Sequence, residues 1–419
     1  MKICELFKVK HIIPILCFAT ILSGCSEKKE EDSKIKQSNV LTEYSFEENV
    51  KSAETNMEME DDSVKVSVQY LPQNEKERKT EIQKLRTQIM AGESPDVFLL
   101  DGISETLTEV KTPLLENPYQ TMGSGALAPL DDFMDKDSYW RNSTYKEEFL
   151  KAGQYNGKQY IIPLSCTYFI YQRSQDMEEM TGNTLNDWLE NAVLSSDNRV
   201  KDTFRKCLPN LSARWIQPAV NYDAGEVIFE SDKWNSFANS YLAFRKTVTA
   251  SDEPELSFRI REISKTGYEN GMELQTVPDI NGAKAAAITA YGAVGMASDY
   301  KQESYDFIML FLNDRVENAI SENPNITRPA MNGFIDPFHF PVQESALNTW
   351  MGTSDEGILR EVKESFEEID SAFFITNAER RMNKEVREIN YLKTSKEQEQ
   401  KLIKLSEDIE NTYKVMIKE

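Results

Sequence analysis

Histidine is almost absent from this sequence, which has only His11 and His339 among its 419 residues. A Ser-His-Asp or Cys-His arrangement would therefore depend on His339, and the phenylalanines on both sides of it favour packing instead. The same scarcity excludes an H-E-x-x-H zinc site and clusters of several histidines. The sequence also lacks a P-loop, a G-x-S-x-G elbow and an EF-hand loop. These absences favour binding over catalysis.

Cysteine and basic residues are also scarce. None of the five cysteines forms a C-x-x-C pair, which argues against a redox or metal role. Cys166 and Cys207 lie outside the N-terminal region, and either a disulfide or two free thiols fits the sequence. Lys and Arg number 48 against 70 Asp and Glu, so the formal net charge is −22. This charge argues against nucleic acid and anionic lipid surfaces as partners.

Long hydrophobic runs are missing too, apart from a short one at Ile12–Leu22. That run is shorter than the roughly 20 residues of a membrane-spanning helix, and basic residues precede it, which is typical of an export signal. The basic residues are Lys2, Lys8 and Lys10. Leu22-Ser23-Gly24-Cys25 follows and resembles a bacterial lipobox, in which Cys25 is lipidated. The alternatives are an ordinary signal peptide and an uncleaved anchor.

We therefore predict a lipoprotein signal peptide at 1–24 and a lipid anchor on Cys25. Residues 25–61 are charged and poor in large apolar side chains, so we interpret them as an acidic tether. The protein is then expected at the cell membrane, on its extracytoplasmic face.

The remaining chain is long enough for two domains, and its first clear pattern is a strand, a helix and a buried strand. Val64–Tyr70 alternates apolar and polar residues, as a strand does. Apolar residues then recur at helix spacing from Ile82 to Ile89, and Gly92 and Pro95 end the helix. Val97–Leu100 is an apolar run typical of a strand buried on both faces.

Asp101 follows that buried strand at its carboxyl end. In open α/β sheets, ligands bind beyond the carboxyl ends of the strands. Tyr70 and Asp101 are therefore candidate ligand contacts at one sheet edge. The alternatives are a ring packed under a loop for Tyr70 and a turn residue for Asp101.

Three motifs occur in order along the chain: Thr87–Phe98, Gln154–Leu164 and Ala285–Ser298. The first resembles the "aGxxPDv" signature of extracellular solute-binding proteins of ABC importers, the maltose-binding-like family. The second resembles that family's "nGKxYgiP" segment, and its Asn-Gly is a hairpin turn signal. The third is similar to the segment that returns the family's chain to its first lobe. The resemblance covers most of residues 62–419.

The resemblance implies a periplasmic-binding-protein-like α/β fold, with two α/β lobes joined by hinge crossings and a cleft between them. The N-terminal lobe is expected at 62–165 and 290–330, and the C-terminal lobe at 166–289 and 331–419. The crossings are expected near 163–166, 288–291 and 328–332. The family's first strand is not obvious here. A degenerate strand at Val40–Phe46 is a candidate for it, and Phe46–Met59 is a candidate for the first helix.

The resemblance also places four further candidates near the cleft. Tyr168 follows the first crossing, where packing against the crossover strand is an equally good interpretation. Trp215 lies outside any helical stripe and is the better candidate for stacking on a sugar. Tyr291 begins the returning segment. Arg328 is a candidate ligand contact, with a surface ion pair as its alternative.

The function implied is that of a membrane-anchored substrate-binding component of an ABC importer. We expect a monomer that binds a small-molecule solute, a sugar or oligosaccharide, and docks on permease subunits, with no cofactor or metal and no enzymatic activity. One alternative is a lipid-anchored glycoside hydrolase, although carboxylate pairs are too numerous to single out a catalytic dyad. Another is a sensory or structural lipoprotein that kept the fold.

Overall fold

The computed structural model describes residues 35–102, 111–247, 259–264, 266–268, 271–312, 340–344, 346–351 and 355–418. Four predictions lie outside the described residues: the signal peptide, lipidation at Cys25, ligand contact by Arg328, and the crossing at 328–332.

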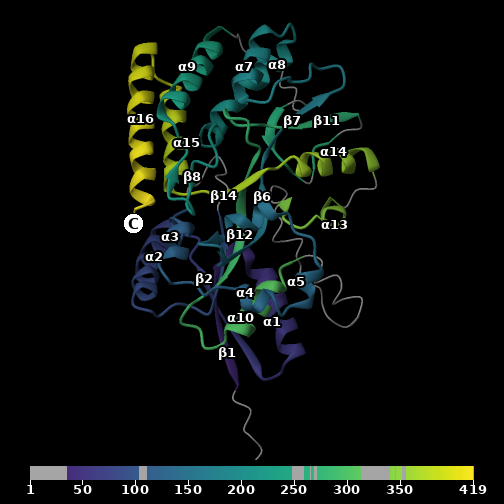
Figure 1. The fold of residues 1–419 in the computed structure, drawn as a ribbon, viewed down its shortest axis with the longest axis vertical. Helices are drawn as coiled ribbons and strands as arrows, with labels where there is room; N and C mark the ends of the chain where they lie inside the picture. Colours follow the sequence, from purple (N-terminus) through teal and green to yellow (C-terminus); the bar gives the residue numbers. More distant parts are fainter. Residues whose placement is uncertain are drawn as a thin grey trace, which may run out of the picture. The chain divides into compact units, whose positions relative to one another are not determined.

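The larger sheet has seven strands, in the order β13-β6-β12-β3-β1-β2, with β14 also paired to β12 (Figure 1). Their bounds are β1 (Lys36–Glu43), β2 (Val64–Leu71), β3 (Val97–Asp101), β6 (Ile161–Thr167), β12 (Ala285–Val294), β13 (Phe340–Pro341) and β14 (Ser371–Phe374). Strand β1 lies between β2 and β3 and is parallel to both, whereas β12 is antiparallel to β3 and β6. Helices α1 (Glu47–Glu60) and α2 (Glu75–Met90) connect the three parallel strands. The predicted strand, helix and buried strand are confirmed.

Helix α2 ends where its sequence predicts. The Asn74 side chain accepts hydrogen bonds from the first-turn backbone N–H groups, and Ile82 and Leu85 are buried. Gly92 follows the helix with φ +81°, a conformation that side chains with a Cβ rarely adopt.

The N-terminal boundary differs from the prediction, because β1 and α1 both lie within the predicted tether at 25–61. The degenerate strand expected at Val40–Phe46 is β1, displaced toward the N-terminus. Asn39 explains why its sequence looks unlike a central strand: its backbone N–H and its side-chain amide both donate to Asp96 Oδ2, at 2.8 and 3.1 Å. Asn39 is exposed, and the Asp of the first motif satisfies its amide within a central strand.

A smaller antiparallel sheet has the order β10-β7-β11. Its strands are β7 (Phe169–Ser174), β10 (Arg259–Glu262) and β11 (Met272–Thr276). The surrounding helices are α7 (Leu185–Leu194), α8 (Asn198–Cys207), α9 (Ser231–Thr247), α15 (Asn377–Ile389) and α16 (Ser395–Met416). The chain passes from the larger to the smaller sheet at Tyr168, just beyond the predicted crossing at 163–166.

The buried apolar side chains form two main clusters, here called the first core and the second core. The first core contains the larger sheet with α2 and α10 (Lys301–Met309), and the second contains β7 with α7, α9, α15 and α16. Phe340, Trp350 and Phe366 belong to the first core, although the sequence assigned 331–419 to the C-terminal lobe. They come from β13, α13 (Leu347–Met351) and α14 (Glu356–Glu367).

The chain also contains several short elements. They are α3 (Pro118–Gly123), α4 (Asp131–Met134), α5 (Ser138–Asn142), α6 (Glu147–Ala152), the hairpin β4 (Gln154–Tyr155) and β5 (Lys158–Gln159), the 3₁₀ helix η2 (Leu208–Arg214), and the hairpin β8 (Val220–Asn221) and β9 (Glu226–Val227). The Asn-Gly of the second motif forms the β4–β5 turn, with φ of 49° at Asn156 and 70° at Gly157. The predicted hairpin is confirmed.

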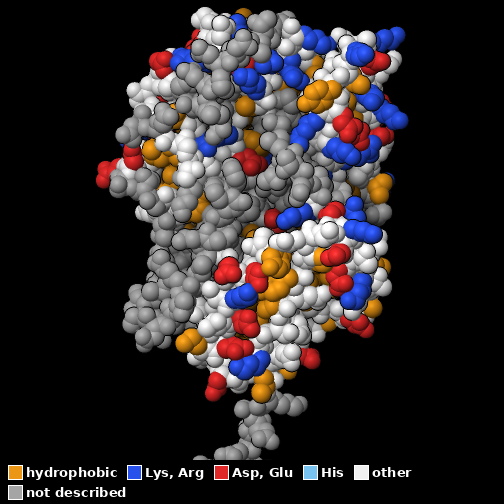
Figure 2. Space-filling model, turned by 180° about the vertical axis from the view of Figure 1, so that it is seen from behind, with side chains coloured by type: hydrophobic (Ala, Val, Ile, Leu, Met, Phe, Trp, Pro, Cys, Tyr) orange, Lys and Arg blue, Asp and Glu red, His pale blue; other side chains and the backbone are white. Residues whose placement is uncertain are grey.

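Charges of both signs are interspersed on the described part of the face that Figure 2 shows. Some form surface ion pairs between helices, such as Arg381 of α15 with Asp408 of α16 at 2.9 Å. Within the described ranges, no helix combines the length and the apolar character needed to cross a membrane.

Candidate functional site

The carboxyl ends of β1, β2 and β3 meet at one edge of the larger sheet, at Glu43, Leu71 and Asp101. Glu43 is paired in register with Leu71, and the residue before it, Thr42, is paired with Leu99. Tyr70 and Asp101 therefore lie at the same edge, as the parallel strands predict. Glu43 places a second carboxyl group at this edge, which no local sequence pattern predicts.

Glu43 is held in a buried ion pair with Arg78 of α2. Two parallel hydrogen bonds join the guanidinium to the carboxylate, both at 2.7 Å, and both side chains are buried. Burial raises the pKa of Glu43, while the hydrogen bonds and charge of Arg78 act in the opposite direction. Arg78 also donates to the Thr112 carbonyl at 2.7 Å, so the pair fixes the chain that returns toward α3. Its role is structural, because both oxygens of Glu43 are occupied.

Tyr70 lies at this edge beside α1. Its ring meets that of Tyr44 edge-on, with centroids 5.9 Å apart, and it is half-buried. The charged groups nearest to it include Glu47 and Lys51 of α1. The structure therefore favours packing beside α1 for Tyr70.

Asp101 is half-buried and paired in register with Ala290 of β12. The next residue, Gly102, donates its backbone N–H to the Thr289 carbonyl at 2.7 Å. A Cβ on Gly102 would lie 2.2 Å from the Ile288 carbonyl oxygen, so this position requires glycine for close packing of the two strands. Gly102 therefore allows the chain at the end of β3 to pack closely against β12.

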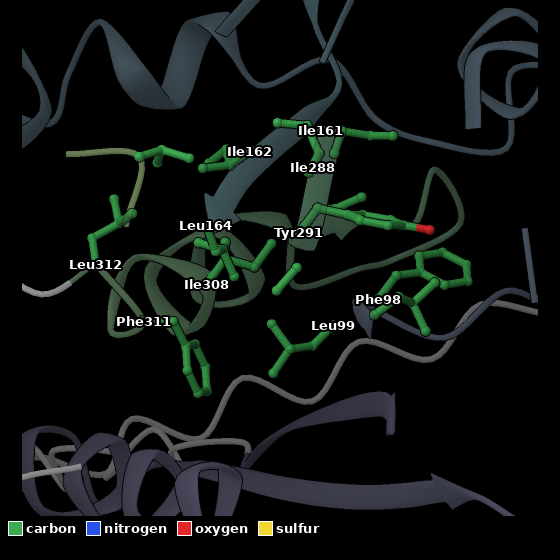
Figure 3. Packing of buried hydrophobic residues seen from close by; sticks show 14 of the residues in the cluster. Phe98, Leu99, Ile161, Ile162, Leu164, Ile288, Tyr291, Ile308, Phe311 and Leu312 are labelled. Atoms are coloured by element: carbon green, nitrogen blue, oxygen red, sulfur yellow. The ribbon is translucent and has the colours of Figure 1, made fainter. Parts of the chain in front are cut away.

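Tyr291 comes from the neighbouring position on β12, and its side chain lies on the same side of the sheet as Phe98 (Figure 3). Ile308 of α10 occupies the opposite side, over Gly292. Tyr291 is 2 % exposed, and burial raises the pKa of its hydroxyl. Its ring meets Phe374 of β14 edge-on, with centroids 5.1 Å apart.

Tyr291 and Phe374 begin a continuous row of aromatic rings, here called the aromatic row. Phe374 meets Tyr119 of α3 edge-on at 5.5 Å, and Tyr119 stacks on Tyr222 at 4.0 Å with planes 11° apart. The backbone N–H of Phe374 also donates to the Tyr119 hydroxyl, at 3.2 Å. The row leads from the first core, which Tyr119 contacts, to the second core, which Tyr222 contacts.

A small pocket borders the second half of the aromatic row. Its empty volume is about 220 Å³ including its open mouth. The lining residues are Tyr119, Gln217, Pro218, Ala219, Val220, Tyr222, Phe373, Phe374, Thr376, Glu379 and Tyr413. Glu379 is buried there and accepts hydrogen bonds from the Thr376 backbone at 2.7 Å, the Gln217 amide at 3.3 Å and the Tyr413 hydroxyl. The pocket thus has aromatic walls and a polar floor.

Tyr168 is fully buried beside β6. Its hydroxyl lies 2.9 Å from Ser365 Oγ of α14, and its ring meets Phe340 edge-on at 5.5 Å. Of the two interpretations left open for Tyr168, the structure shows packing.

Trp215 is 1 % exposed and packs against three aromatic residues of α9. Its ring centroid lies 5.4 Å from Trp234, 5.0 Å from Phe237 and 5.9 Å from Tyr241. Its indole N–H is buried and has no hydrogen-bond acceptor among the residues that the structure describes. A buried donor without a partner costs stability.

A second pocket lies beside Trp215, with an empty volume of about 320 Å³ including its open mouth. Its lining residues are Phe169, Leu185, Arg214, Trp215, Val277, Pro278, Asp279, Ala283 and Ala285. The Arg214 guanidinium lies over the Phe169 ring, 4.5 Å from its centroid, and contacts Glu262 at 3.4 Å. The pocket therefore offers cationic and indole donors next to apolar walls.

Sequence reasoning missed Tyr119, Tyr222, Phe374 and Arg214. Tyr222 stands in a turn before Asp-Ala-Gly and Tyr119 follows Asn-Pro, which are signals for loops and not for the contact between them. Their stacking depends on how the two cores meet, so a one-dimensional pattern does not contain it.

The described part of the chain contains no group of three or more His, Cys, Asp or Glu side chains that could hold a metal ion. Cys166 and Cys207 are not joined by a disulfide; Cys166 is buried and Cys207 is half-buried. Burial raises the pKa of the Cys166 thiol, which makes it a poor nucleophile.

No family model and no curated protein matches this sequence. Solved structures do match its fold over nearly the whole chain. A family 1 extracellular solute-binding protein from Alicyclobacillus acidocaldarius is 13 % identical, with a TM-score of 0.58 over 91 % of this chain and 99 % of its own. The sugar-binding protein MalE from Xanthomonas citri is 12 % identical, with a TM-score of 0.60 over 92 % and 100 %. An ABC substrate-binding protein from Listeria monocytogenes, solved with cycloalternan, is 17 % identical, with a TM-score of 0.52 over 90 % and 98 %.

The chain therefore has the fold of the extracellular solute-binding proteins, with two α/β lobes joined by hinge crossings, as the three sequence motifs predicted. We use the name first lobe for the larger sheet and the name second lobe for the smaller sheet with α7, α9, α15 and α16; the first core also includes Ile170 of the smaller sheet.

Proposed function

We propose that this protein binds a carbohydrate between its two lobes and serves as the membrane-anchored substrate-binding component of an ABC importer, not as an enzyme. The observation that carries the proposal is the match of a complete two-lobe fold to sugar-binding proteins. Among solved structures of similar fold, one from Thermotoga lettingae holds tagatose and another holds maltotetraose. The match covers at least 89 % of this chain in each case.

The aromatic row supplies the chemistry that a sugar requires. A sugar ring has apolar C–H faces and hydroxyl edges, so aromatic rings bind its faces while amides and carboxylates bind its edges. Tyr119 and Tyr222 offer ring faces from the two lobes, and Gln217 offers an amide beside them. We propose these three as ligand contacts in addition to Tyr291 and Asp101.

Trp215 and Arg214 form the second proposed contact region. The indole N–H lacks an acceptor among the described residues, and a sugar hydroxyl would satisfy it. Phe169 supplies an apolar surface in the same pocket. Tyr70 and Tyr168 are assigned a packing role instead, because one lies beside α1 and the other is enclosed by α14 and β13.

A ligand that contacts both lobes stabilises the arrangement in which they are close, because it makes all its contacts only there. The closed form is then the one that the permease subunits would recognise. Lipid on Cys25 would hold the protein at the extracytoplasmic face of the membrane. The support for the lipid anchor is the sequence Leu22-Ser23-Gly24-Cys25.

Thermal unfolding in the presence of sugars tests the proposal. The full chain is heated with maltotetraose, mannotriose or tagatose, and binding to the folded state alone raises Tm. A sugar at about 100 times its Kd adds about 2.7 kcal/mol to the free energy of unfolding. We expect a rise of Tm with at least one sugar in a wider panel of mono- and oligosaccharides.

The matched controls are two tyrosine variants. Tyr222→Ala removes a proposed contact and should lose the sugar-induced rise, whereas Tyr391→Ala changes an exposed tyrosine outside both pockets and should keep it. A panel in which no sugar raises Tm, or a rise that Tyr222→Ala leaves unchanged, would contradict this assignment of the site.

A further inference from the structure

Two contacts join the first lobe to one short turn of the second. Tyr119 stacks on Tyr222 with ring centroids 4.0 Å apart. Beside it, the backbone N–H of Asn156 donates to Asp223 Oδ1 at 3.1 Å. Tyr119 packs against the first core and Tyr222 against the second, so the contacts bridge the lobes.

The turn that carries Tyr222 and Asp223 is held by its own hairpin. Val220 is paired with Val227 across β8 and β9, and the Asn221 side chain accepts the Ala224 backbone N–H at 3.1 Å. The side chains of Tyr222 and Asp223 therefore both come from one small hairpin that is stabilised by its own hydrogen bonds. A change in the spacing of the lobes would move them together.

The partners in the first lobe are equally well fixed. Tyr119 is in the first turn of α3, where the Asn117 side chain accepts its backbone N–H at 3.1 Å. Its hydroxyl accepts the Phe374 backbone N–H at 3.2 Å. Asn156 has a left-handed conformation at the β4–β5 turn, and its N–H is directed to Asp223 instead of to its own hairpin. Neither contact requires a ligand.

We propose that Tyr222 and Asp223 form an interlobe latch with Tyr119 and Asn156, which holds the lobes closed when no solute is bound. The latch lies beside the pocket that Tyr119 and Tyr222 line, so separating its rings widens that pocket. It thereby sets the fraction of molecules that are open to a solute. Its biological meaning depends on the proposed function, but its existence can be tested without a ligand.

Hydrogen exchange of the full chain in detergent, with no sugar present, tests the latch. Two amides report on it: Asn156, bonded to Asp223, and Phe374, bonded to Tyr119. Asp223→Ala removes only the acceptor of the Asn156 N–H. If the latch opens as a unit, exchange rises roughly two- to tenfold in peptides 153–160 and 371–376 alike, because each contact shifts the closed equilibrium by about that factor.

Tyr222→Ala is the reciprocal variant and should accelerate both peptides in the same way. Asp223→Asn keeps an oxygen acceptor, so the exchange of both peptides should stay as slow as in the wild type. Tyr391→Ala should have no effect, since that side chain is exposed and distant in sequence from either contact. Slow exchange in peptide 285–294 of β12 shows that each variant is folded.

The latch is refuted if Asp223→Ala accelerates only peptide 153–160, or if Tyr222→Ala leaves that peptide at the wild-type rate. Either result means that the two contacts open independently. A sugar-induced rise of Tm would still be measured in that case, so failure of the latch is distinct from failure of the proposed function.

Discussion

At the scale of single residues, Trp215 packs in a core and also lines a pocket. The sequence identified it as a stacking candidate because it lies outside any helical stripe, and the structure places it in an aromatic cluster formed with α9. It also borders a pocket and has an indole N–H with no acceptor in the described part of the chain. One side chain therefore contributes to the second core and to the proposed site.

The two contributions of Trp215 can be measured apart. Trp215→Ala should lower the free energy of unfolding by about 3–5 kcal/mol, because it leaves a large cavity in the second core. Trp215→Phe keeps most of the apolar volume and should cost less, but it should reduce the sugar-induced rise of Tm because the N–H donor is gone. Urea unfolding and thermal shift check the two values. An alanine variant as stable as the wild type would contradict the packing, and a phenylalanine variant with an unchanged sugar response would contradict the donor role.

Glycine at the end of β3 is a second residue whose role is visible only in three dimensions. Gly102→Ala would place a Cβ 2.2 Å from the Ile288 carbonyl oxygen, and backbone atoms on both sides would have to move. We expect a loss of about 1–3 kcal/mol in the free energy of unfolding, measured with urea.

Gly357→Ala is the matched control, because its new Cβ would meet only the Asp355 carboxylate at 3.1 Å. It should change stability little. Equal stability of the two variants would show that β12 and the end of β3 are not as close as described.

At the scale of elements, the structure distinguishes signals that are local from those that are not. Helix α2 and its end at Gly92 follow from periodicity and from one residue's backbone freedom, so the sequence predicts them. The bounds of strand β1 do not follow, because its polar residue Asn39 is hydrogen-bonded to Asp96, which precedes β3 and is distant in the sequence. The stacking of Tyr119 on Tyr222 depends on the packing of two lobes, which is even further from any local pattern. Asp101 and Trp215 could thus be proposed from the sequence, whereas the contact between Tyr119 and Tyr222 could not.

Helix α7 carries a local signal that also sets a pH dependence. Thr184 and Asp187 form a capping box, and hydrogen bonds from the Thr184 side chain and backbone hold the pKa of Asp187 below its ordinary value of 3.8. A carboxyl whose pKa is lower in the folded state stabilises the fold above 3.8 and loses that contribution as the pH falls through the folded pKa.

Asp187→Asn should therefore be less stable than the wild type at pH 6, and the difference should shrink as the pH is lowered below 3.8. Thermal unfolding across this range measures it. A difference that stays constant with pH would show that the charge of Asp187 does not contribute through the cap.

At the scale of the whole molecule, the net charge limits the class of solute that the protein is expected to bind. A formal charge of −22 repels anionic solutes and leaves neutral sugars unaffected. The two lobes, the aromatic row and the acidic surface are thus mutually consistent with a neutral carbohydrate.

Isothermal titration calorimetry of the full chain in detergent against a panel of neutral mono- and oligosaccharides, with the sugar recovered afterwards and weighed by mass spectrometry, tests the central claim most directly. Saturable binding of one sugar per chain, with that sugar recovered intact, is the predicted result. Absence of heat with every sugar of the panel, or recovery of a shortened sugar, would contradict the claim.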